Sequence, residues 1–474
     1  MAENYEPVIG LEIHCQLSTK TKMFCACALS FGDEPNTHTC PICLGHPGSL
    51  PFTNAEAVHF ALMIGMALEC EIAPRSIFHR KNYFYPDLPK GYQISQYDIP
   101  LATNGRLGDV RIHRVHLEED AAKLLHGGSS GRIHDAGEST VDFNRGGTPL
   151  VEIVTEPDLR APSEAAEWGR LLRATLKRLG VSDVNMDEGS LRIDANVSVR
   201  PAGETEFGTK AELKNMNSFR FLEQGITAEI ARQESILQRG GEVEQETLHF
   251  DPQTRELSSL RSKEYAHDYR YFPEPDLVPI VPTEQMLTRA REALPELPAA
   301  RAQRFESDLG LPEETAKLLA FRSELGDYFE AALAADSADA RTLANWVRNE
   351  LVQRLGDTDP AESKITPEAL ARLVGMVEAK SVSQSNAKEV LGVLVEEGGD
   401  PAQIVEQRGM SMAADDELES IVSRVIEADP DAVEQIRSGN QKAIGALMGA
   451  IMRETKGRAD GKEVQRLIRE RIGG

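Results

Sequence analysis

The first clear pattern in the chain is Val8-Ile9-Gly10-Leu11-Glu12-Ile13-His14-Cys15-Gln16-Leu17, in which every second residue is apolar. A period of two predicts a β-strand with one apolar face. The opposite face then carries Glu12 and His14 side by side, and a carboxylate beside an imidazole can hold a metal ion or move a proton. A strand face exposed to solvent would show the same pattern, so this stretch alone leaves both interpretations open.

The length and charge of the chain limit the kinds of protein it can be. With 474 residues it is too long for one hydrophobic core, and several domains are expected. The net charge of −24 argues against a protein that coats nucleic acid. The longest apolar run, at 60–68, is too short to span a bilayer, and the acidic N-terminus does not resemble a secretory signal. We therefore expect a cytoplasmic protein with no membrane partner.

Four of the six cysteines lie close together in the sequence, namely Cys25, Cys27, Cys40 and Cys43. Two such pairs can close a tetrahedral zinc site, which leaves no open position for catalysis when all four ligands are thiolates. A redox Cys-x-x-Cys would explain the second pair but not the first. Structural zinc that pins a long loop is therefore the favoured interpretation. The two remaining cysteines, Cys15 and Cys70, are expected to be core thiols.

Acidic residues recur beside or inside stretches that look like strands. The triplet Glu118-Glu119-Asp120 follows an alternating stretch at 111–117, and Glu152 lies inside the apolar stretch 150–154. Adjacent carboxylates repel one another unless a cation is near, although an acidic triplet can also lie exposed to solvent. An isolated buried carboxylate is costly. Together with Glu12 and His14, these residues would form an oxygen-rich site that suits Mg²⁺ or Mn²⁺ better than zinc.

Three further segments could contact a substrate. The segment 79–93 places basic residues beside tyrosines and prolines, which suits phosphate binding but also a packed structural loop. The strand predicted at 191–200 has a wholly polar second face, which is either solvent surface or the floor of a cleft. The stretch GGSSG at 127–131 looks like the serine-rich core of amidases. No hydrophobic strand would hold a nucleophile there, so we interpret it as a flexible connection.

The composition changes after about residue 290, where strand patterns give way to helical stripes rich in Ala, Glu, Leu and Arg. Pro295-Glu296-Leu297-Pro298 marks a boundary, and a second break lies near 409. We predict a catalytic domain at 1–295 with a zinc-binding insertion at about 25–43, a helical domain at 296–408 and a helical tail at 409–474. The last 23 residues are basic in an acidic protein, which indicates either nucleic-acid binding or a solvated amphipathic helix.

Seven motifs resemble the B subunit of bacterial aspartyl/glutamyl-tRNA amidotransferases. They are VIGLEIH (8–14), RKNYFYPD (80–87), LEED (117–120), NRGGTPL (144–150), GSLRIDANVSVR (189–200), KAELKN (210–215) and DYRYFPEPD (268–276). The likeness runs in order along essentially the whole chain, including the helical tail. The stretch at 127–131 matches no motif of this family, which supports dismissing it as a nucleophile.

The resemblance implies an α+β fold and a specific reaction. The catalytic domain would be a cradle with a glutamine-synthetase-like antiparallel sheet, followed by an all-α bundle and a small helical tail that grips tRNA. Such proteins use ATP and Mg²⁺ to phosphorylate the side-chain carboxylate of Glu-tRNA(Gln) or Asp-tRNA(Asn). Ammonia from the amidase, which is the A subunit of the enzyme, then displaces the phosphate, and the small C subunit holds the other two together. The synthetase that misacylates the tRNA is a further expected partner.

The resemblance also implies roles for single residues. Glu12, His14, Glu119 and Glu152 fall where the catalytic Mg²⁺ is held, and the choice of Glu119 over Glu118 rests on the family alone. Lys81 falls where a lysine contacts phosphate, and the four cysteines match the zinc-bearing members of the family. Contacts to ATP or the aminoacyl end are expected from Lys81, Tyr83, Tyr85, Arg192, Asp194, Asn196 and Lys214. Contacts of the tail to tRNA are expected from Lys456, Arg458, Lys462 and Arg466.

Two other classes of function fit parts of the sequence. A scaffold could present tRNA to a partner that does all the chemistry, but it would have no need of the interior carboxylate Glu152. A free-standing amidase or ligase is the other alternative. The sequence offers no convincing nucleophile constellation for an amidase, and it lacks the Walker P-loop that is the commonest ATP site. We therefore predict the ATP-dependent subunit of a tRNA-dependent amidotransferase.

Overall fold

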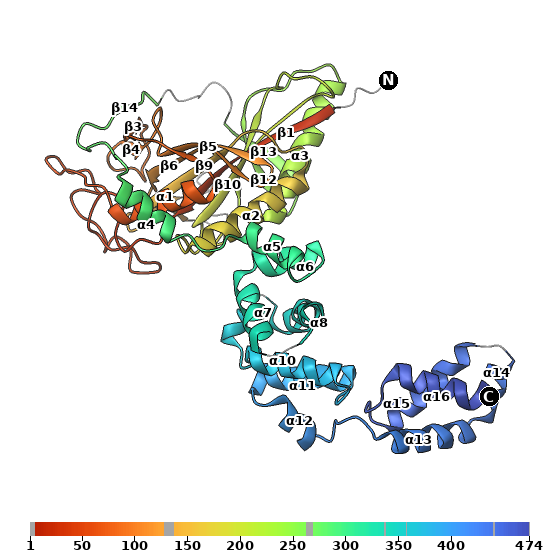
Figure 1. Cartoon of the computed structure of the whole chain (residues 1–474). Helices are drawn as coiled ribbons and strands as arrows, with labels where there is room; N and C mark the ends of the chain where they lie inside the picture. Colours follow the sequence, from red (N-terminus) through yellow and green to blue (C-terminus); the bar gives the residue numbers. More distant parts are fainter. Residues whose placement is uncertain are drawn as a thin grey trace. The chain divides into compact units, whose positions relative to one another are not determined.

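The computed structural model describes residues 5–127, 137–261, 269–335, 338–356, 358–438 and 441–473. The chain divides into two compact units, Met1–Pro298 and Ala299–Gly474 (Figure 1). The first unit is built around a large sheet, and the second consists of helices in its described residues. The predicted α+β class with a helical C-terminal region is thus confirmed. Asp268 and most of the stretch at 127–131 lie outside the described residues.

The first unit contains a nine-stranded sheet in which β1 (Tyr5–Gln16) pairs with β9 (Pro149–Thr155) on one side and β10 (Leu191–Pro201) on the other. Beyond β9 lie β6 (Val110–Glu119), β5 (Ala102–Leu107) and β2 (Glu71–Ile72). Beyond β10 lie β11 (Ala211–Met216), β12 (Thr247–Asp251) and β13 (Glu256–Arg261). All pairings are antiparallel except that of β11 with β12, which is parallel.

The parallel pair is the one departure from the antiparallel sheet expected from the family resemblance. Its cause is the connection between the two strands, because α3 (Phe219–Gln238) carries the chain from the end of β11 back to the start of β12. A crossover of this kind returns the chain to the end of the sheet where β11 began, so β12 runs in the same direction as β11. A hairpin turn would instead make the next strand run in the opposite direction. The sheet is therefore mixed at this one position.

Three helices of the first unit begin or end at residues that suit a helix terminus. Helix α1 (Ala55–Ala67) begins after Asn54, whose side chain accepts hydrogen bonds from two backbone N–H groups of the first turn. Helix α2 (Pro162–Leu179) ends at Gly180, which adopts a left-handed φ of 68°. Helix α3 begins after Ser218, whose hydroxyl accepts a hydrogen bond from the backbone N–H of Phe221.

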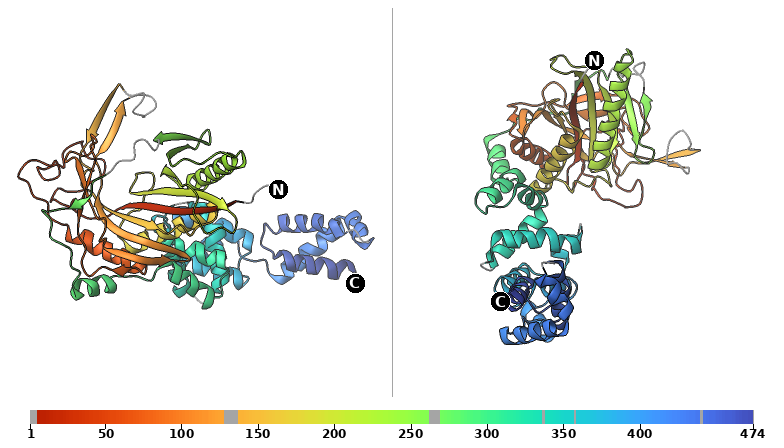
Figure 2. Two further views of the ribbon diagram at one scale, coloured as in Figure 1. Left: turned by 90° about the horizontal axis from the view of Figure 1, so that it is seen from above. Right: turned by 90° about the vertical axis from the view of Figure 1, so that its right-hand side faces the viewer.

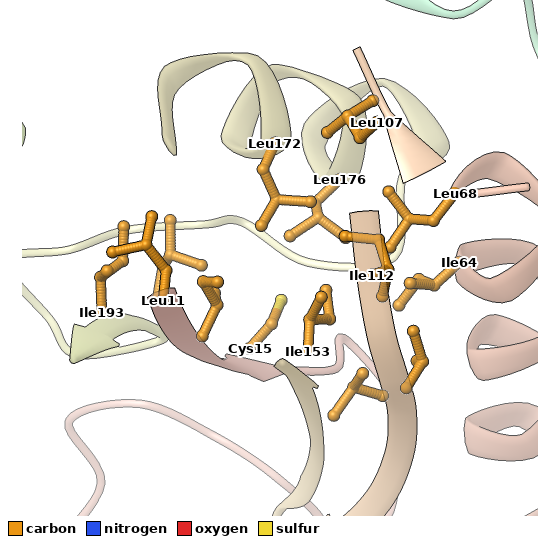
Figure 3. Packing of buried hydrophobic residues seen from close by; sticks show 14 of the residues in the cluster. Leu11, Cys15, Ile64, Leu68, Leu107, Ile112, Ile153, Leu172, Leu176 and Ile193 are labelled. Carbon is orange, nitrogen blue, oxygen red and sulfur yellow. The ribbon is translucent and has the colours of Figure 1, made fainter. Parts of the chain in front are cut away.

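The core of the first unit lies between the sheet and these helices. Figure 3 shows Leu11, Cys15 and Ile153 of the sheet facing Leu172 and Leu176 of α2. Ile64 of α1, Leu68 directly after that helix, and Leu222 and Ile226 of α3 belong to the same buried cluster. The alternating residues of β1 thus place their apolar side chains against the helices. The polar side chains of β1 consequently point to the other face of the sheet.

Two smaller sheets complete the first unit, together with helix α4 (Glu284–Glu292). In one of them, β3 (His79–Asn82) lies between β4 (Tyr92–Ser95) and β14 (Phe272–Pro273). This sheet contains the segment that the sequence suggested for phosphate binding. The other, β7 (Lys123–Gly127) with β8 (Glu138–Asp142), is a two-stranded sheet that projects from the large sheet (Figure 2).

The helical unit has two hydrophobic clusters. The first runs from Phe305 to Val405 and the second from Leu418 to Ile472. The helices of the first are α5 (Pro298–Ser307), α6 (Glu313–Phe321), α7 (Ser323–Ala335), α8 (Ala340–Asn345), α9 (Val352–Leu355), α10 (Pro367–Glu378), α11 (Gln384–Glu397) and α12 (Pro401–Gln407). Those of the second are α13 (Asp415–Ala428), α14 (Pro430–Arg437), α15 (Ile444–Glu454) and α16 (Gly461–Gly473). The domain limits at 295 and 408 stay predictions.

In the described part of the chain, no helix combines the length and apolar character needed to cross a membrane.

Candidate active site on the polar face of the sheet

Strand β1 places Glu12 and His14 on the face of the sheet opposite to the core. Their neighbours Ile13 and Cys15 are fully buried against the helices, so alternation turns Glu12 and His14 the other way. The register of the sheet sets His14 opposite Glu152 of β9 on one side and Arg192 of β10 on the other. The polar face predicted from residues 8–17 is therefore flanked by charged residues of both neighbouring strands.

Glu152 lies at the centre of a row of side chains that crosses three strands. Its Oε2 lies 3.4 Å from His14 Nε2 of β1 and 3.5 Å from Nε2 of His116, which follows on β6. Its Oε1 lies 3.4 Å from Nη2 of Arg114. Glu152, whose burial without a partner would be costly, thus has three basic partners. Glu12 extends the row, because its Oε1 is 3.7 Å from His14 Nε2.

The charges in this row act strongly on one another because Glu152 and His116 at its centre are almost fully buried. Burial would raise the pKa of Glu152, but the contacts with His116 and His14 outweigh it and hold the pKa well below its usual range. Burial would lower the pKa of His116, yet the neighbouring carboxylates raise it to about 9. For Glu12, burial and the charge of Glu152 raise the pKa. The protein alone thus already contains tightly interacting carboxylates and imidazoles at this place.

The row contains two sets of groups that could hold a cation. Ligand atoms of His14, Glu118 and Glu152 all lie within 4.8 Å of one another, as do those of Glu12, His14 and Asp194. Two carboxylates with one imidazole form a hard, oxygen-rich donor set, which fits Mg²⁺ or Mn²⁺. Besides burial, the charge of Glu152 raises the pKa of the neighbouring Glu12 carboxyl, so a cation would relieve repulsion already present in the protein.

Glu118, and not Glu119, lies in this cluster. Neighbouring residues of a strand point to opposite faces, and Glu118 shares the face of His116, with Oε1 3.3 Å from the imidazole Nε2. The Glu119 carboxylate instead pairs with the Lys90 ammonium and accepts a hydrogen bond of 3.0 Å from the backbone N–H of Ile94. The expectation that Glu119 holds the metal is thus not supported by the geometry.

Lys81 and Tyr83 lie close to the same carboxylates. The Lys81 ammonium lies 4.9 Å from the centre of the Tyr269 ring, and the Tyr83 ring contacts that ring edge to face. Burial would lower the pKa of Lys81, but the charge of Glu118 and then of Tyr271 and Glu152 raises it. A cation held in this way would attract a phosphate group that approaches the cluster.

The residues expected to meet ATP or the aminoacyl end are divided between several places. The Arg192 guanidinium donates to Asp120 Oδ1 at 3.0 Å, and Lys214 donates to Asp194 Oδ2 at 3.1 Å. Asn196 lies further along β10, opposite Gly10 of β1, and is partly exposed. Tyr85 is 43% exposed and lines a surface hollow beside Phe84 and Leu88. Tyr85 therefore stands apart from the row on the large sheet.

His116 is the residue of the cluster that the sequence did not single out. Glu118 and Asp120 belong to the acidic triplet that the sequence suggested for a cation site, and Asp120 accepts hydrogen bonds from Gln16 Nε2 at 2.6 Å and from Arg192. A strand over 111–119 puts residues 116 and 118 on one face. Which of its faces meets Glu152 depends on the register between strands, and no local pattern encodes that register.

The four cysteines expected to bind zinc are brought together by the loop between β1 and α1. Ligand sulfurs of Cys25, Cys27, Cys40 and Cys43 lie within 4.8 Å of one another. The hydrogen bond from Cys25 is the main cause that lowers the pKa of Cys43, to about 4. Lys22 Nζ lies 3.7 Å from Cys43 Sγ. A set of four thiols with a ready thiolate fits Zn²⁺ in a closed, structural site. Cys15 is buried in the core, whereas Cys70 is only partly buried.

The basic residues predicted in the tail are partly neutralised by neighbouring acids. Arg458 forms an ion pair of 2.5 Å with Glu417, and Arg466 of α16 pairs with Glu463 and Glu470. Lys456 and Lys462 are both exposed. Of the four residues expected to contact tRNA, the two arginines are thus paired with acids, whereas the two lysines lie at the surface.

Comparison with known proteins identifies the family. The family model described as "GatB/GatE catalytic domain" matches residues 7–288. A second model, described as "GatB domain", matches residues 327–472. The chain belongs to this family of amidotransferase subunits. The two matches correspond to the sheet-containing unit and to most of the helical unit.

Relatives of the chain match it over nearly its whole length. The B subunit of the aspartyl/glutamyl-tRNA(Asn/Gln) amidotransferase from Anaeromyxobacter sp. is 47% identical over 99% of both chains. The proteins of the same name from Persephonella marina and Carboxydothermus hydrogenoformans are 46% and 48% identical, over 98–99% of this chain and 99% of theirs. Family membership thus rests on the catalytic and the helical parts alike.

Proposed function

We propose that this chain activates the side-chain carboxylate of tRNA-bound glutamate or aspartate for amidation. A carboxylate oxygen of Glu-tRNA(Gln) or Asp-tRNA(Asn) attacks the γ-phosphorus of ATP and ADP leaves. Ammonia then attacks the carbonyl carbon of the acyl phosphate, inorganic phosphate leaves, and Gln-tRNA(Gln) or Asn-tRNA(Asn) results. The observation that carries the proposal is the cluster of His14, Glu118 and Glu152 in a chain whose full-length relatives are named amidotransferase subunits.

The residues of the polar face have different roles in this reaction. His14, Glu118 and Glu152 would hold Mg²⁺, which when bound neutralises negative charge on the phosphate oxygens of ATP. Lys81 adds a positive charge beside them and orients the γ-phosphate. Arg192 is held by Asp120 at the polar face and supplies a fixed cation that can bind the aminoacyl carboxylate. We propose that the sheet is the floor of a glutamine-synthetase-like cradle around these groups.

We further propose that the chain works in the cytoplasm as part of a heterotrimer. The amidase partner, the A subunit of the enzyme, would supply ammonia from glutamine, and the small C subunit would hold the assembly together. The synthetase that misacylates the tRNA would be a transient partner. A pure tRNA scaffold is disfavoured, because a presenting surface has no need of buried carboxylates such as Glu118 and Glu152.

The proposal is tested by measuring ADP release from the assembled complex with Mg²⁺ and glutamine. The assays contain Glu-tRNA(Gln), Asp-tRNA(Asn), the same tRNAs uncharged, or no tRNA. ADP release that requires one of the charged tRNAs is expected, and it identifies the physiological substrate at the same time. ADP release that is indifferent to aminoacylation would assign the chemistry elsewhere and leave this chain as a scaffold.

The four-cysteine cluster is proposed to hold one structural zinc ion. We expect about one zinc per chain in the purified protein, by the four-thiolate rule, and its loss in Cys43→Ser. Cys70→Ser is the matched control, because Cys70 is a partly buried thiol outside the cluster. Elemental analysis of the three proteins decides the matter. A wild-type protein without zinc would refute the assignment.

The tail is proposed to bind tRNA through Lys456, Arg458, Lys462 and Arg466. Truncation after residue 408 is expected to lower the affinity for tRNA but to spare glutamine hydrolysis in the complex, because the second hydrophobic cluster begins only at Leu418. Filter binding with labelled tRNA measures the first effect and ammonia release the second. Unchanged tRNA affinity would show that the basic helix is ordinary surface.

A further inference from the structure

His116 is a buried imidazole that touches both carboxylates of the cluster. Its side chain is 2% exposed, and its Nε2 lies 3.3 Å from Glu118 Oε1 and 3.5 Å from Glu152 Oε2. One ring nitrogen thus serves two carboxylates on two neighbouring strands. The other, Nδ1, is buried and makes no hydrogen bond within the part of the chain that the structure describes. The polar contacts of the ring are therefore directed at this pair.

The two carboxylates of Glu118 and Glu152 need a donor that they share. Glu118 and Glu152 are both almost fully buried, and two negative charges at this separation repel strongly where water is excluded. A donor that contacts both oxygens offsets the repulsion and fixes the orientation of each carboxylate. Ser95 also donates to Glu118 and Arg114 to Glu152, but neither hydrogen bond joins the two carboxylates.

The exposure of the two histidines separates their roles. His14 and His116 flank Glu152 in one row across the sheet, but the His14 side chain is 18% exposed and that of His116 only 2%. A cation that enters from the polar face therefore reaches His14, whereas the His116 side chain is closed off from solvent. We propose that His116 is a positioning residue that holds Glu118 and Glu152 together for cation binding.

This inference rests on the proposed function, since it assumes that the cluster binds a divalent cation. It predicts that a side chain without a donor at 116 weakens cation binding while an amide donor largely preserves it. Loss of a group that orients metal ligands typically costs about 10–100-fold in affinity. We expect a loss of that size in His116→Met and a loss of less than about fivefold in His116→Gln, because methionine fills the space without donating and glutamine donates.

The test titrates Mn²⁺ into the full-length chain in its complex and follows free Mn²⁺ by electron paramagnetic resonance. ADP release gives the Mg²⁺ concentration for half-maximal activity and the rate at saturating Mg²⁺. His113→Gln is the matched control, because His113 lies on the same strand, is 56% exposed and pairs with Glu156. We expect His116→Met to raise the half-maximal Mg²⁺ concentration more than it lowers the saturating rate, with His113→Gln unchanged.

The outcomes distinguish an error in the cation site from an error in the positioning role of His116. If the wild-type protein and Glu152→Gln bind Mn²⁺ equally weakly, the cation site itself is wrong. If the wild-type protein binds Mn²⁺ and Glu152→Gln does not, but His116→Met and His116→Gln both bind as the wild type does, the positioning role is overturned. Equal losses in His116→Met and His116→Gln would also overturn it, because a donor would then make no difference. Thermal unfolding of each variant shows that the comparison is made on folded protein.

Discussion

Replacing Glu118 with glutamine is expected to lower ADP formation by at least about 100-fold and to abolish Mn²⁺ binding, whereas Glu119→Gln should still bind Mn²⁺. The reason is geometric. The Glu118 carboxylate lies within 4.8 Å of the ligand atoms of His14 and Glu152, whereas that of Glu119 pairs with Lys90. Glutamine keeps the size of the side chain and removes its charge, so the two variants differ in where the charge is lost.

The readout that separates the two glutamates is Mn²⁺ binding by the assembled complex. Activity alone would not suffice, because breaking the ion pair between Glu119 and Lys90 also disturbs a buried contact. Glu156→Gln is a suitable control, because Glu156 directly follows the strand of Glu152 and pairs with the exposed His113. If Glu119→Gln loses Mn²⁺ binding and Glu118→Gln retains it, then Glu119 is the metal ligand, as the family resemblance implies.

Replacing Lys81 with methionine is expected to lower the rate of ADP formation by about 100-fold or more, with little change in Mn²⁺ binding. The Lys81 ammonium is a partly buried cation whose pKa is raised by the charges of Glu118 and Glu152, and its charge would stabilise the phosphate oxygens as the phosphoryl group moves. Methionine has a similar length and no charge. Single-turnover measurement of ADP with saturating charged tRNA isolates the chemical step.

A matched control for this variant is Lys123→Met, since Lys123 is exposed on the two-stranded sheet. We expect the control to have wild-type activity. Glutamine hydrolysis by the complex should be preserved in both variants, which shows that assembly is intact. A Lys81→Met protein with the wild-type rate at saturating ATP would remove Lys81 from the reaction and leave it as a structural cation.

The local elements of the fold could be predicted because their signals are local. Asn54, Ser218 and Gly180 mark helix ends through their own side chain or backbone, and the alternation at 8–17 marks a strand with an inner and an outer face. The order of the strands could not be predicted from composition or periodicity. Strand β1 pairs with β9 and β10, which follow more than a hundred residues later, and the parallel pairing of β12 depends on how α3 packs.

The candidate site was predicted in part for the same reason. Glu12, His14 and Glu152 stood out because polar residues interrupted apolar patterns, and the structure brings them together. The choice between Glu118 and Glu119 required knowledge of which face of β6 meets β9. His116 carried no signal of its own, since a histidine in an alternating strand is usually exposed. Its importance comes entirely from the register that sets it opposite Glu152.

Labelling with ¹⁸O tests whether the side-chain carboxylate is phosphorylated on this sheet. Glu-tRNA(Gln) or Asp-tRNA(Asn) labelled in both side-chain carboxylate oxygens is converted by the complete complex with ATP and glutamine, and the inorganic phosphate is analysed by mass spectrometry. We expect one ¹⁸O in each phosphate released, because the oxygen that attacks the γ-phosphorus leaves with the phosphate. Phosphate without ¹⁸O, formed while the amide product accumulates, would contradict phosphorylation of the carboxylate.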